Sequence, residues 1–224
     1  MPSSILHPPS TSPQRATGII LRTRPLTETS LIVNWLTADQ GRISTVAKGA
    51  RRPKSPFAGK LDLFYEADFN FQRSRRSELH TLREVVVRQT HPALREDIGR
   101  LQQACHASAL IEQTTETESP LPEIHALLAG FLNHLPQQTP RPRNIFAFEL
   151  KLLHALGLEP GIAETKLPAD TQQLVVALLE TTWEELHTLR ATAAQARAVQ
   201  QFLHGFLIFH LGRIPKGRSS VIAR

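Results

Sequence analysis

Hydrophobic and polar residues alternate in short segments over the N-terminal part of the chain, and turn residues such as Asp39-Gln40-Gly41 separate these segments. The runs with this strand pattern are 16–22, 30–36, 42–47, 64–71 and 79–87. Segment 64–71 alternates strictly, so we expect Phe69 and Phe71 to face the core while Glu66 and Asp68 face solvent. Five closely spaced strands indicate a small antiparallel barrel or sandwich, and a five-stranded OB-type barrel fits their number.

From residue 92 the hydrophobic period becomes that of helices. A first apolar face contains Leu94, Ile98, Leu101, Cys105 and Ser108 or Ala109. Further amphipathic helices are predicted over 124–135 and 145–156, the second ending at Gly157, with shorter ones at 174–179 and 183–189. Segment 199–211 is apolar on nearly all sides, which predicts a central buried helix.

These patterns predict an α+β multidomain protein, with an N-terminal five-stranded OB-type β-barrel followed by an all-α helical domain. We expect a flexible Pro/Ser-rich tail over 1–14, an OB-fold DNA-binding domain over 15–90, a helical domain over 91–212 and a basic C-terminal tail over 213–224.

The charge of the 224-residue chain is concentrated in its N-terminal part, although the net charge is only +6 overall. Residues 1–90 contain 14 Lys and Arg against 7 Asp and Glu, a net charge of +7. Residues 91–212 contain 8 against 13, a net charge of −5, and the last residues are again basic. This distribution favours a polyanionic partner for the predicted barrel.

The strongest single signal is the segment T-V-A-K-G-A-R-R-P-K-S-P-F-A-G-K at 45–60, which has no acidic residue. Pro53 and Pro56 oppose helix and central strand, so the segment is expected to form a loop. Its cations have no acidic neighbours and repel one another, so such a loop is stable mainly where water or a polyanion such as nucleic acid screens them. A second cationic segment is the connection at 73–77. The expected DNA-binding residues are Arg42, the loop residues Lys48, Arg51, Arg52, Lys54 and Lys60, and Arg73, Arg75 and Arg76 of the connection.

Barrels of the OB type bind single strands through a charged groove with stacking aromatic side chains. Among the aromatic residues of the predicted barrel, Phe57 stands between the loop cations and is the candidate for base stacking. A solvated surface remains the alternative for the cations of the 73–77 connection.

The chain lacks the common signatures of catalysis: neither a phosphate-binding glycine loop nor a nucleophile elbow is present. Cys105, the single cysteine, is expected to be a small buried hydrophobic residue, and no disulfide can form within the chain. No histidine pair has helical metal-site spacing, so we expect no cofactor and no metal. A nuclease would need a carboxylate cluster, for which Asp62, Glu66 and Asp68 are the only local candidates.

No apolar stretch is long enough to span a bilayer, and the first residues lack the regions of a secretory signal. These features, with the single cysteine, predict a cytoplasmic protein without membrane association. The chain is therefore interpreted as a binding protein and not an enzyme. The alternative is a helical interaction scaffold whose barrel binds a protein partner instead of DNA.

Several motifs resemble those of RecO, the bacterial recombination mediator family. They are R-x-x-x-E-T-S-L-I-V at 24–33, T-x-x-x-G-R at 37–42, V-A-K-G-A-R-R at 46–52 followed by Lys54-Ser55, and F-E-L-x-L-L-x-x-L-G at 148–157. The basic segment with Lys216, Arg218 and Ser219 is similar to the final stretch of the family. The resemblance extends over nearly the whole chain.

This resemblance implies an OB domain, a helical domain and a non-enzymatic role in RecF-pathway DNA repair and recombination. RecO-like proteins bind single- and double-stranded DNA, anneal complementary strands and work with RecR, often with RecF. With these partners they help to load RecA onto DNA coated by single-strand-binding protein, whose C-terminal tail they also bind. The resemblance therefore implies a protein associated with the bacterial nucleoid.

The chain departs from the family at 157–170, where many members carry a four-cysteine zinc module and this sequence has no cysteine. The position of the partner-tail site is a separate hypothesis. Arg141, Arg143 and Lys151 lie near Phe146 and Phe148 in the sequence and are candidates for pairing a terminal carboxylate beside an apolar groove. The alternative is a charged surface edge on a core helix.

Overall fold

The computed structural model of the protein describes residues 13–222. The chain forms two compact units, one with the described residues up to Trp35 and Ile43–Gln89, the other with Leu36–Arg42 and the chain from Thr90 onward. Most of the predicted flexible tail at 1–14 lies outside the described residues. Its last residue, Gln14, is the first residue of a strand, which begins two residues before the predicted run.

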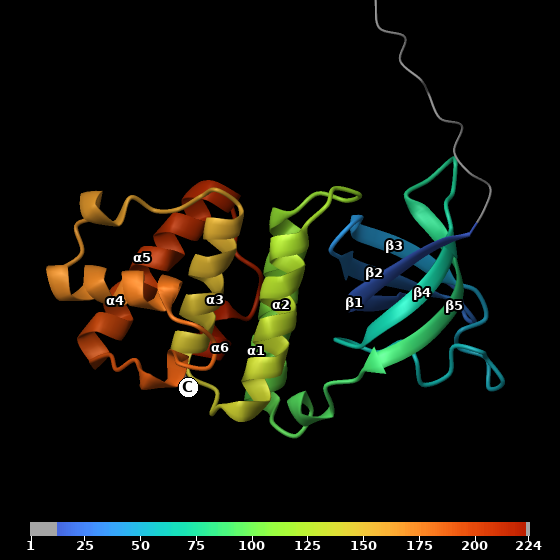
Figure 1. Ribbon diagram of the computed structural model, residues 1–224, viewed down its shortest axis with the longest axis horizontal. Helices are drawn as coiled ribbons and strands as arrows, with labels where there is room; N and C mark the ends of the chain where they lie inside the picture. Colours follow the sequence, from blue (N-terminus) through green and yellow to red (C-terminus); the bar gives the residue numbers. More distant parts are fainter. Residues whose placement is uncertain (1–12, 223–224) are drawn as a thin grey trace, which may run out of the picture. The chain divides into compact units, whose positions relative to one another are not determined.

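A closed five-stranded β-barrel forms the N-terminal part of the structure (Figure 1). Its strands are β1 (Gln14–Pro25), β2 (Leu31–Thr37), β3 (Gly41–Ala47), β4 (Glu66–Gln72) and β5 (Leu79–Gln89). The order around the barrel is β1-β2-β3-β5-β4, with β3 parallel to β5 and β4 antiparallel to β1 and β5. A closed Greek-key barrel of five strands is the OB architecture, so the predicted fold class is confirmed.

The barrel interior is filled by the alternating large side chains of its strands. Every second residue of β3 and β4 is buried, as their patterns predicted. Trp35 stacks on Phe69 with ring centroids 4.1 Å apart, and the indole Nε1 donates to the Thr45 hydroxyl at 2.9 Å. Phe71 continues this aromatic cluster. The predicted core positions of Phe69 and Phe71 are confirmed.

The C-terminal part of the chain is helical. Its longer helices are α1 (Ile98–Thr114), α2 (Pro122–His134), α3 (Pro142–Ala155), α4 (Ala169–Glu180), α5 (Ala193–Leu211) and α6 (Arg218–Ile222). Short 3₁₀ turns at Pro92–Leu94, Leu135–Gln137, Ile162–Glu164 and Leu186–Thr188 connect them. Helix α5 begins with a capping box, in which Thr192 and Gln195 bond each other's backbone N–H groups, and ends at Gly212 with φ of +69°.

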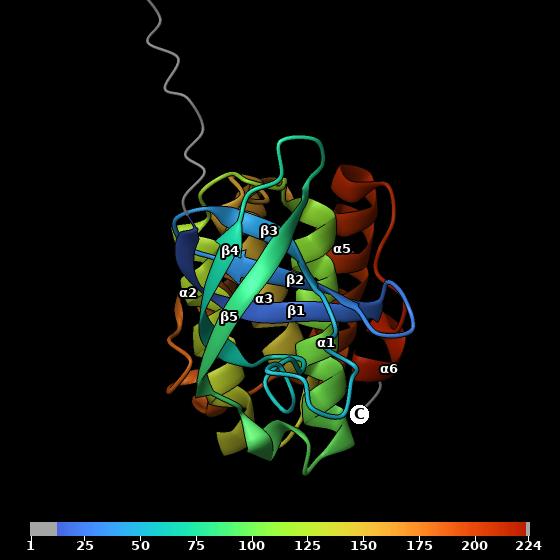
Figure 2. The same cartoon turned by 90° about the vertical axis from the view of Figure 1, so that its right-hand side faces the viewer.

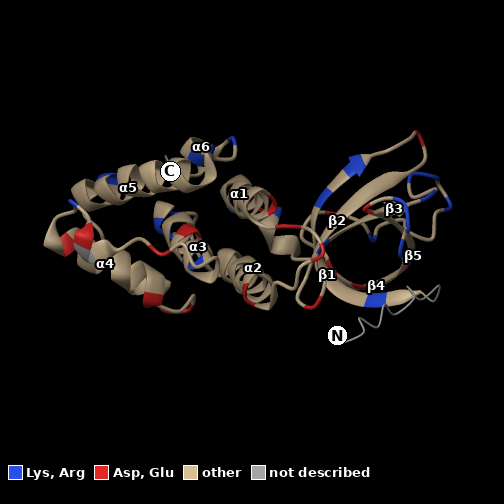
Figure 3. Cartoon of the chain, turned by 90° about the horizontal axis from the view of Figure 1, so that it is seen from above, with Lys and Arg blue, Asp and Glu red and all other residues tan. Residues whose placement is uncertain are grey.

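Helix α3 is the centre of the helical unit, since it packs against α1, α2, α4, α5 and α6. Figure 3 shows α3 between α2 on one side and α4 and α5 on the other. The prediction that 199–211 is the central buried helix is wrong: in α5 only Val199, Leu203 and Leu207 are buried, and Phe209 is 83% exposed. Apolar residues on all sides of a helix therefore did not lead to burial on all sides.

The apolar face predicted for α1 is only partly buried: Leu94 and Ser108 are buried, but other members of the face are not. The buried residues of α1 include Ala104, Ala107 and Leu110, whereas Ile98 is exposed. Cys105 is exposed as well, so its predicted burial is wrong. The helix instead turns the polar residues Gln103 and His106 inward, where hydrogen bonds with α3 residues compensate for their burial.

The predicted basic tail at 213–224 contains helix α6, which is attached to the helical core by a buried ion pair. Arg218 is 5% exposed, and its Nε and Nη2 atoms donate to the two carboxylate oxygens of Glu149, each at 2.7 Å. His106 lies 3.0 Å from the same carboxylate. Arg218 is thus a structural residue of the helical unit, because a guanidinium can be buried when a carboxylate accepts two of its hydrogen bonds.

Candidate nucleic-acid interface

The cation-rich connection between β3 and β4, residues 48–60, is called the basic loop below. Its backbone runs through successive turns, in which the N–H groups of Arg52, Ser55 and Lys60 each donate to a carbonyl three residues earlier. Gly49 starts this path with φ of +71°, a conformation that favours glycine. The turns keep the loop compact, and Lys48, Arg52 and Lys54 are exposed on it.

Two anchors hold the basic loop on the barrel. Phe57 packs into the barrel core, and Arg51 bonds the β1–β2 turn, its backbone N–H donating to Thr29 O at 3.0 Å and its guanidinium to Thr27 O at 3.3 Å. The turn is itself braced, because the Thr27 hydroxyl accepts from the Ser30 N–H at 3.1 Å. The loop and the turn therefore form one surface.

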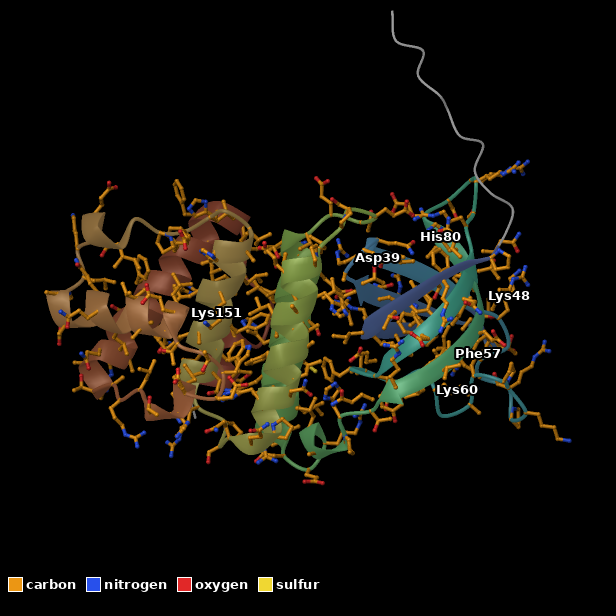
Figure 4. The ribbon with its side chains drawn as sticks, viewed as in Figure 1. Asp39, Lys48, Phe57, Lys60, His80 and Lys151 are labelled. Atoms are coloured by element: carbon orange, nitrogen blue, oxygen red, sulfur yellow. The ribbon has the colours of Figure 1, made fainter. Side chains whose placement is uncertain are left out.

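A groove of about 420 Å³ lies on this surface. It is lined by Leu26, Thr27, Thr29, Ser30, Val46, Lys48, Gly49 and Arg52. The groove has two cations and hydroxyl groups but no carboxylate. Lys48 and Arg52 are exposed, and Figure 4 shows Lys48 and Lys60 in this part of the barrel.

The cations of the basic loop are mostly unpaired. Within residues 13–222, the side chains of Lys48, Arg52, Lys54 and Lys60 have neither a hydrogen bond nor an ion pair with the protein. Exposed cations without acidic partners can exchange their screening ions for phosphate oxygens. The groove and the loop cations together are suited to bind a phosphodiester backbone.

The predicted cations of the β4–β5 connection form a second, separate cluster. In the β3–β5 ladder Ser44 pairs with Leu79, so this connection lies beside the start of β3, whereas the basic loop follows the end of β3. Figures 1 and 2 both show the two connections at opposite ends of the barrel. Arg75 and Arg76 are exposed, whereas Arg73 is half-buried and donates to Gln14 Oε1 at 2.8 Å.

Arg42 belongs to neither cluster. It is assigned to the second compact unit, where its Nε donates to the Thr115 hydroxyl at 2.8 Å and its Nη2 to the carbonyl of the same residue. Burial lowers the pKa of this guanidinium. The predicted role of Arg42 in DNA binding is therefore corrected, because its guanidinium is partly buried and two of its N–H donors already bond Thr115.

The predicted stacking role of Phe57 is wrong. The side chain is 6% exposed and packs in the barrel core, so no ring face is open to a base. In the described part of the barrel, Trp35, Phe64, Phe69 and Phe71 are also buried, and Tyr65 is half-buried. Sequence reasoning missed Leu26, which is 46% exposed in the groove. The available signal was an apolar residue at the start of a polar turn.

A second cavity, about 390 Å³ in volume, lies in the helical unit. It is lined by Gln138, Thr139, Arg141, Pro142, Arg143, Phe146, Leu174, Leu178, Leu189, Arg190, Ala191 and Ala196. It combines three arginines with apolar side chains and has no acidic residue. The structure therefore brings together Arg141, Arg143 and Phe146, and adds Arg190, which the sequence pattern did not suggest.

The arginine N–H donors of this cavity are only partly satisfied by hydrogen bonds within the protein. Arg143 donates to Leu189 O at 3.3 Å, while its buried Nε has no hydrogen-bond partner among residues 13–222. Burial, then the charges of Arg190 and Arg141, lower the pKa of Arg143. Lys151, labelled in Figure 4, does not line the cavity; its Nζ donates to Leu179 O at 2.5 Å, so its predicted role is corrected. Phe148 is buried in the helical core and does not line the cavity either.

Comparison with known proteins agrees with both parts of the structure. The family model "Recombination protein O N terminal" matches residues 12–91, and "Recombination protein O C terminal" matches residues 95–165. Together the two models span about two thirds of the chain. The chain belongs to the RecO family.

Similar RecO proteins come from several bacteria. The chain is 35% identical to "DNA repair protein RecO" of Anaeromyxobacter sp. (strain K) over 148 residues, which is 66% of this chain and 58% of the relative. It is 35% identical to the Symbiobacterium thermophilum RecO over 149 residues, 65% of this chain and 57% of the relative. It is 31% identical to Bacillus pumilus RecO over 148 residues, which is 66% of this chain and 57% of the relative. The match thus spans less than two thirds of each relative.

The segment that follows α3 contains no cysteine. Residues 157–170 lead through the 3₁₀ turn Ile162–Glu164 into α4. Across residues 13–222, no three or more His, Cys, Asp or Glu side chains gather closely enough to hold a metal ion. No helix in the described range has the length and apolar character needed to cross a membrane.

Proposed function

We propose that this protein is a non-enzymatic DNA repair mediator whose barrel binds and anneals single-stranded DNA. The unpaired cations of the basic loop, next to a groove without acidic residues, carry the proposal. Membership of the RecO family supports it, as does the name "DNA repair protein RecO" of the relatives. Cations that neutralise phosphates on two strands lower the repulsion that opposes their pairing.

The proposal includes the partners expected for a RecO protein. With RecR, and in some settings RecF, the protein would help to load RecA onto DNA coated by single-strand-binding protein, and it would also bind double-stranded DNA. The arginine-lined cavity supports binding of that protein's acidic, apolar C-terminal tail, because guanidinium groups pair with carboxylates beside an apolar surface. Such a mediator would work in the bacterial cytoplasm, at the nucleoid.

A charge-reversal variant tests the DNA interface. Lys48, Arg52 and Lys54 are changed to Glu, and Arg51 is kept because it fastens the loop to the β1–β2 turn. In fluorescence anisotropy with a labelled single-stranded oligonucleotide, we expect an affinity loss of roughly 100-fold at moderate salt, together with loss of annealing. The wild type should show a log–log salt slope of about −3, as for four or five phosphate contacts on a single strand.

The matched control reverses Lys166, Arg197 and Arg213, three exposed cations of the helical unit, and changes the net charge equally. This control should bind DNA nearly as the wild type does. A folded loop variant that still anneals strands would exclude the proposed interface. If the wild type binds acidic peptides but no oligonucleotide at physiological salt, the barrel serves a protein partner instead. Cleavage of labelled DNA with magnesium would indicate a nuclease.

A further inference from the structure

The buried aromatic residues of the barrel raise the question of what contacts the bases of a bound strand. Besides half-buried Tyr65, the large apolar side chains exposed on the described part of the barrel are Leu26 at 46% and Val86 at 63%. Binding through phosphates alone leaves unstacked bases in water, so an exposed apolar side chain beside the phosphate-binding cations gains contact area when a base covers it.

Leu26 and Val86 lie in different electrostatic surroundings. Leu26 lines the groove that contains Lys48 and Arg52 and no carboxylate. Val86 lines another groove, on β1, β4 and β5, in which the one cation, Arg15, is paired with Asp68 and Glu84 adds a second carboxylate. Only the first of these surroundings combines an apolar surface with unneutralised positive charge. A nucleotide has the matching properties, since its base has apolar faces and its phosphate is an anion.

The position of Leu26 is fixed before any ligand binds. Its backbone N–H donates to Ser30 O at 2.9 Å, which closes the β1–β2 turn. Arg51 fastens this turn to the basic loop through Thr27 and Thr29. Because the backbone of the turn is already ordered, binding there does not have to pay for ordering a loop, so the contact of Leu26 with a ligand contributes more fully to affinity.

We propose that this groove holds one nucleotide of the bound strand, with the phosphate on Lys48 and Arg52 and the base against Leu26 and Val46. The volume of about 420 Å³ lies within the usual range for small-molecule sites. The inference rests on the proposed function, because it assigns a nucleotide subsite to the same interface. An aliphatic contact has no hydrogen-bond pattern to read, so Leu26 and Val46 do not select among the bases.

The test compares two fluorescein-labelled single strands of equal length, one ordinary and one in which every base is replaced by an abasic site. Wild-type protein should bind the ordinary strand more tightly. In Leu26→Ala the ratio of the two affinities should fall by about fivefold, since the shorter side chain makes less apolar contact with the base. The affinity for the abasic strand should stay unchanged. Leu26→Trp should increase the preference through stacking.

Val86→Ala is the matched control, because it shortens an exposed apolar side chain of the same barrel outside the cationic groove. It should leave both affinities unchanged. The double variant Lys48→Gln, Arg52→Gln should lower the affinity for the ordinary strand and for the abasic strand by the same factor. Thermal unfolding confirms that each variant is folded.

Two results would overturn the nucleotide subsite while leaving the DNA interface in place. In the first, Leu26→Ala keeps the wild-type preference for the ordinary strand. In the second, Leu26→Ala lowers the affinity for the abasic strand as much as the affinity for the ordinary strand. Wild-type protein that binds neither strand would overturn the proposed function and the subsite together.

Discussion

In the barrel, Lys48, Arg52 and Lys54 extend from a loop without acidic residues, whereas in the helical unit Arg218 is buried and donates two hydrogen bonds to Glu149. Both groups are cationic, and both come from segments of the sequence that lack nearby acids. The difference is the carboxylate that the fold supplies to Arg218. A paired, desolvated guanidinium holds helices together, whereas unpaired, hydrated cations remain available to an external anion.

The arginines of the helical cavity are intermediate between these two cases. Arg143 is half-buried and bonds a carbonyl, and Arg141 is exposed, but neither has a carboxylate partner within the described range. A terminal carboxylate of a bound peptide would complete this site in the way Glu149 completes Arg218. The role of a cation in this protein therefore depends on whether the fold supplies it with a carboxylate. Variants that remove a cation or its carboxylate test this dependence.

The largest effect is expected from Arg218→Ala. Removal of this side chain leaves the Glu149 carboxylate buried without its charged partner, which costs about 3–5 kcal/mol of unfolding free energy. Urea unfolding followed by circular dichroism measures this loss. Arg213→Ala, at an exposed arginine of the same segment, should change the unfolding free energy by less than about 0.5 kcal/mol. Equal stability of the two variants would contradict the role given to the buried pair.

Acid should weaken the same contact. Burial alone would raise the pKa of Glu149, but hydrogen bonds from Arg218 and His106 outweigh it, so the pKa is lowered in the folded protein. The stabilisation is therefore complete above the ordinary carboxyl pKa of about 4.3 and is lost as the pH falls through the lower folded value. Unfolding free energies measured between pH 7 and pH 3 should decline less steeply in Glu149→Gln than in the wild type. Exposed Glu123→Gln should keep the wild-type slope.

A smaller effect is expected at the helical cavity. Arg141→Gln should weaken binding of an acidic peptide with a free, apolar C-terminal residue by roughly fivefold, because one charge-assisted hydrogen bond to the terminal carboxylate is lost. Binding of the same peptide with an amidated C-terminus should not change, and fluorescence anisotropy distinguishes the two. An equal loss for both peptides would show that Arg141 acts through general charge and not through the terminal carboxylate.

Part of the interface was predictable because it depends on local features. The basic loop follows from cations and prolines that are adjacent in sequence, and the core positions of Phe69 and Phe71 follow from strict alternation along β4. The role of Phe57 did not follow, since it stands in a loop between cations, while the core residues that it packs with come from strands distant in sequence. Leu26 was missed for the same reason: the cations Lys48 and Arg52, which line the same groove, are distant from it in sequence.

Helix α5 and Cys105 show a second reason for error. The apolar pattern of their helices predicted burial, yet Phe209 and Cys105 are exposed. The reason is that α3 occupies the centre and each neighbouring helix buries only the face that meets it. Periodicity gives the amount of apolar surface on a helix but not the element that covers it.

The sequence by itself determined the strand and helix periods, the barrel class and the concentration of positive charge in the N-terminal part, since these depend on residues close together along the chain. Only the tertiary structure decided which cations are paired and which apolar side chains are exposed. Both outcomes depend on the desolvation and partners that distant segments supply, such as Glu149 for Arg218 and the barrel core for Phe57.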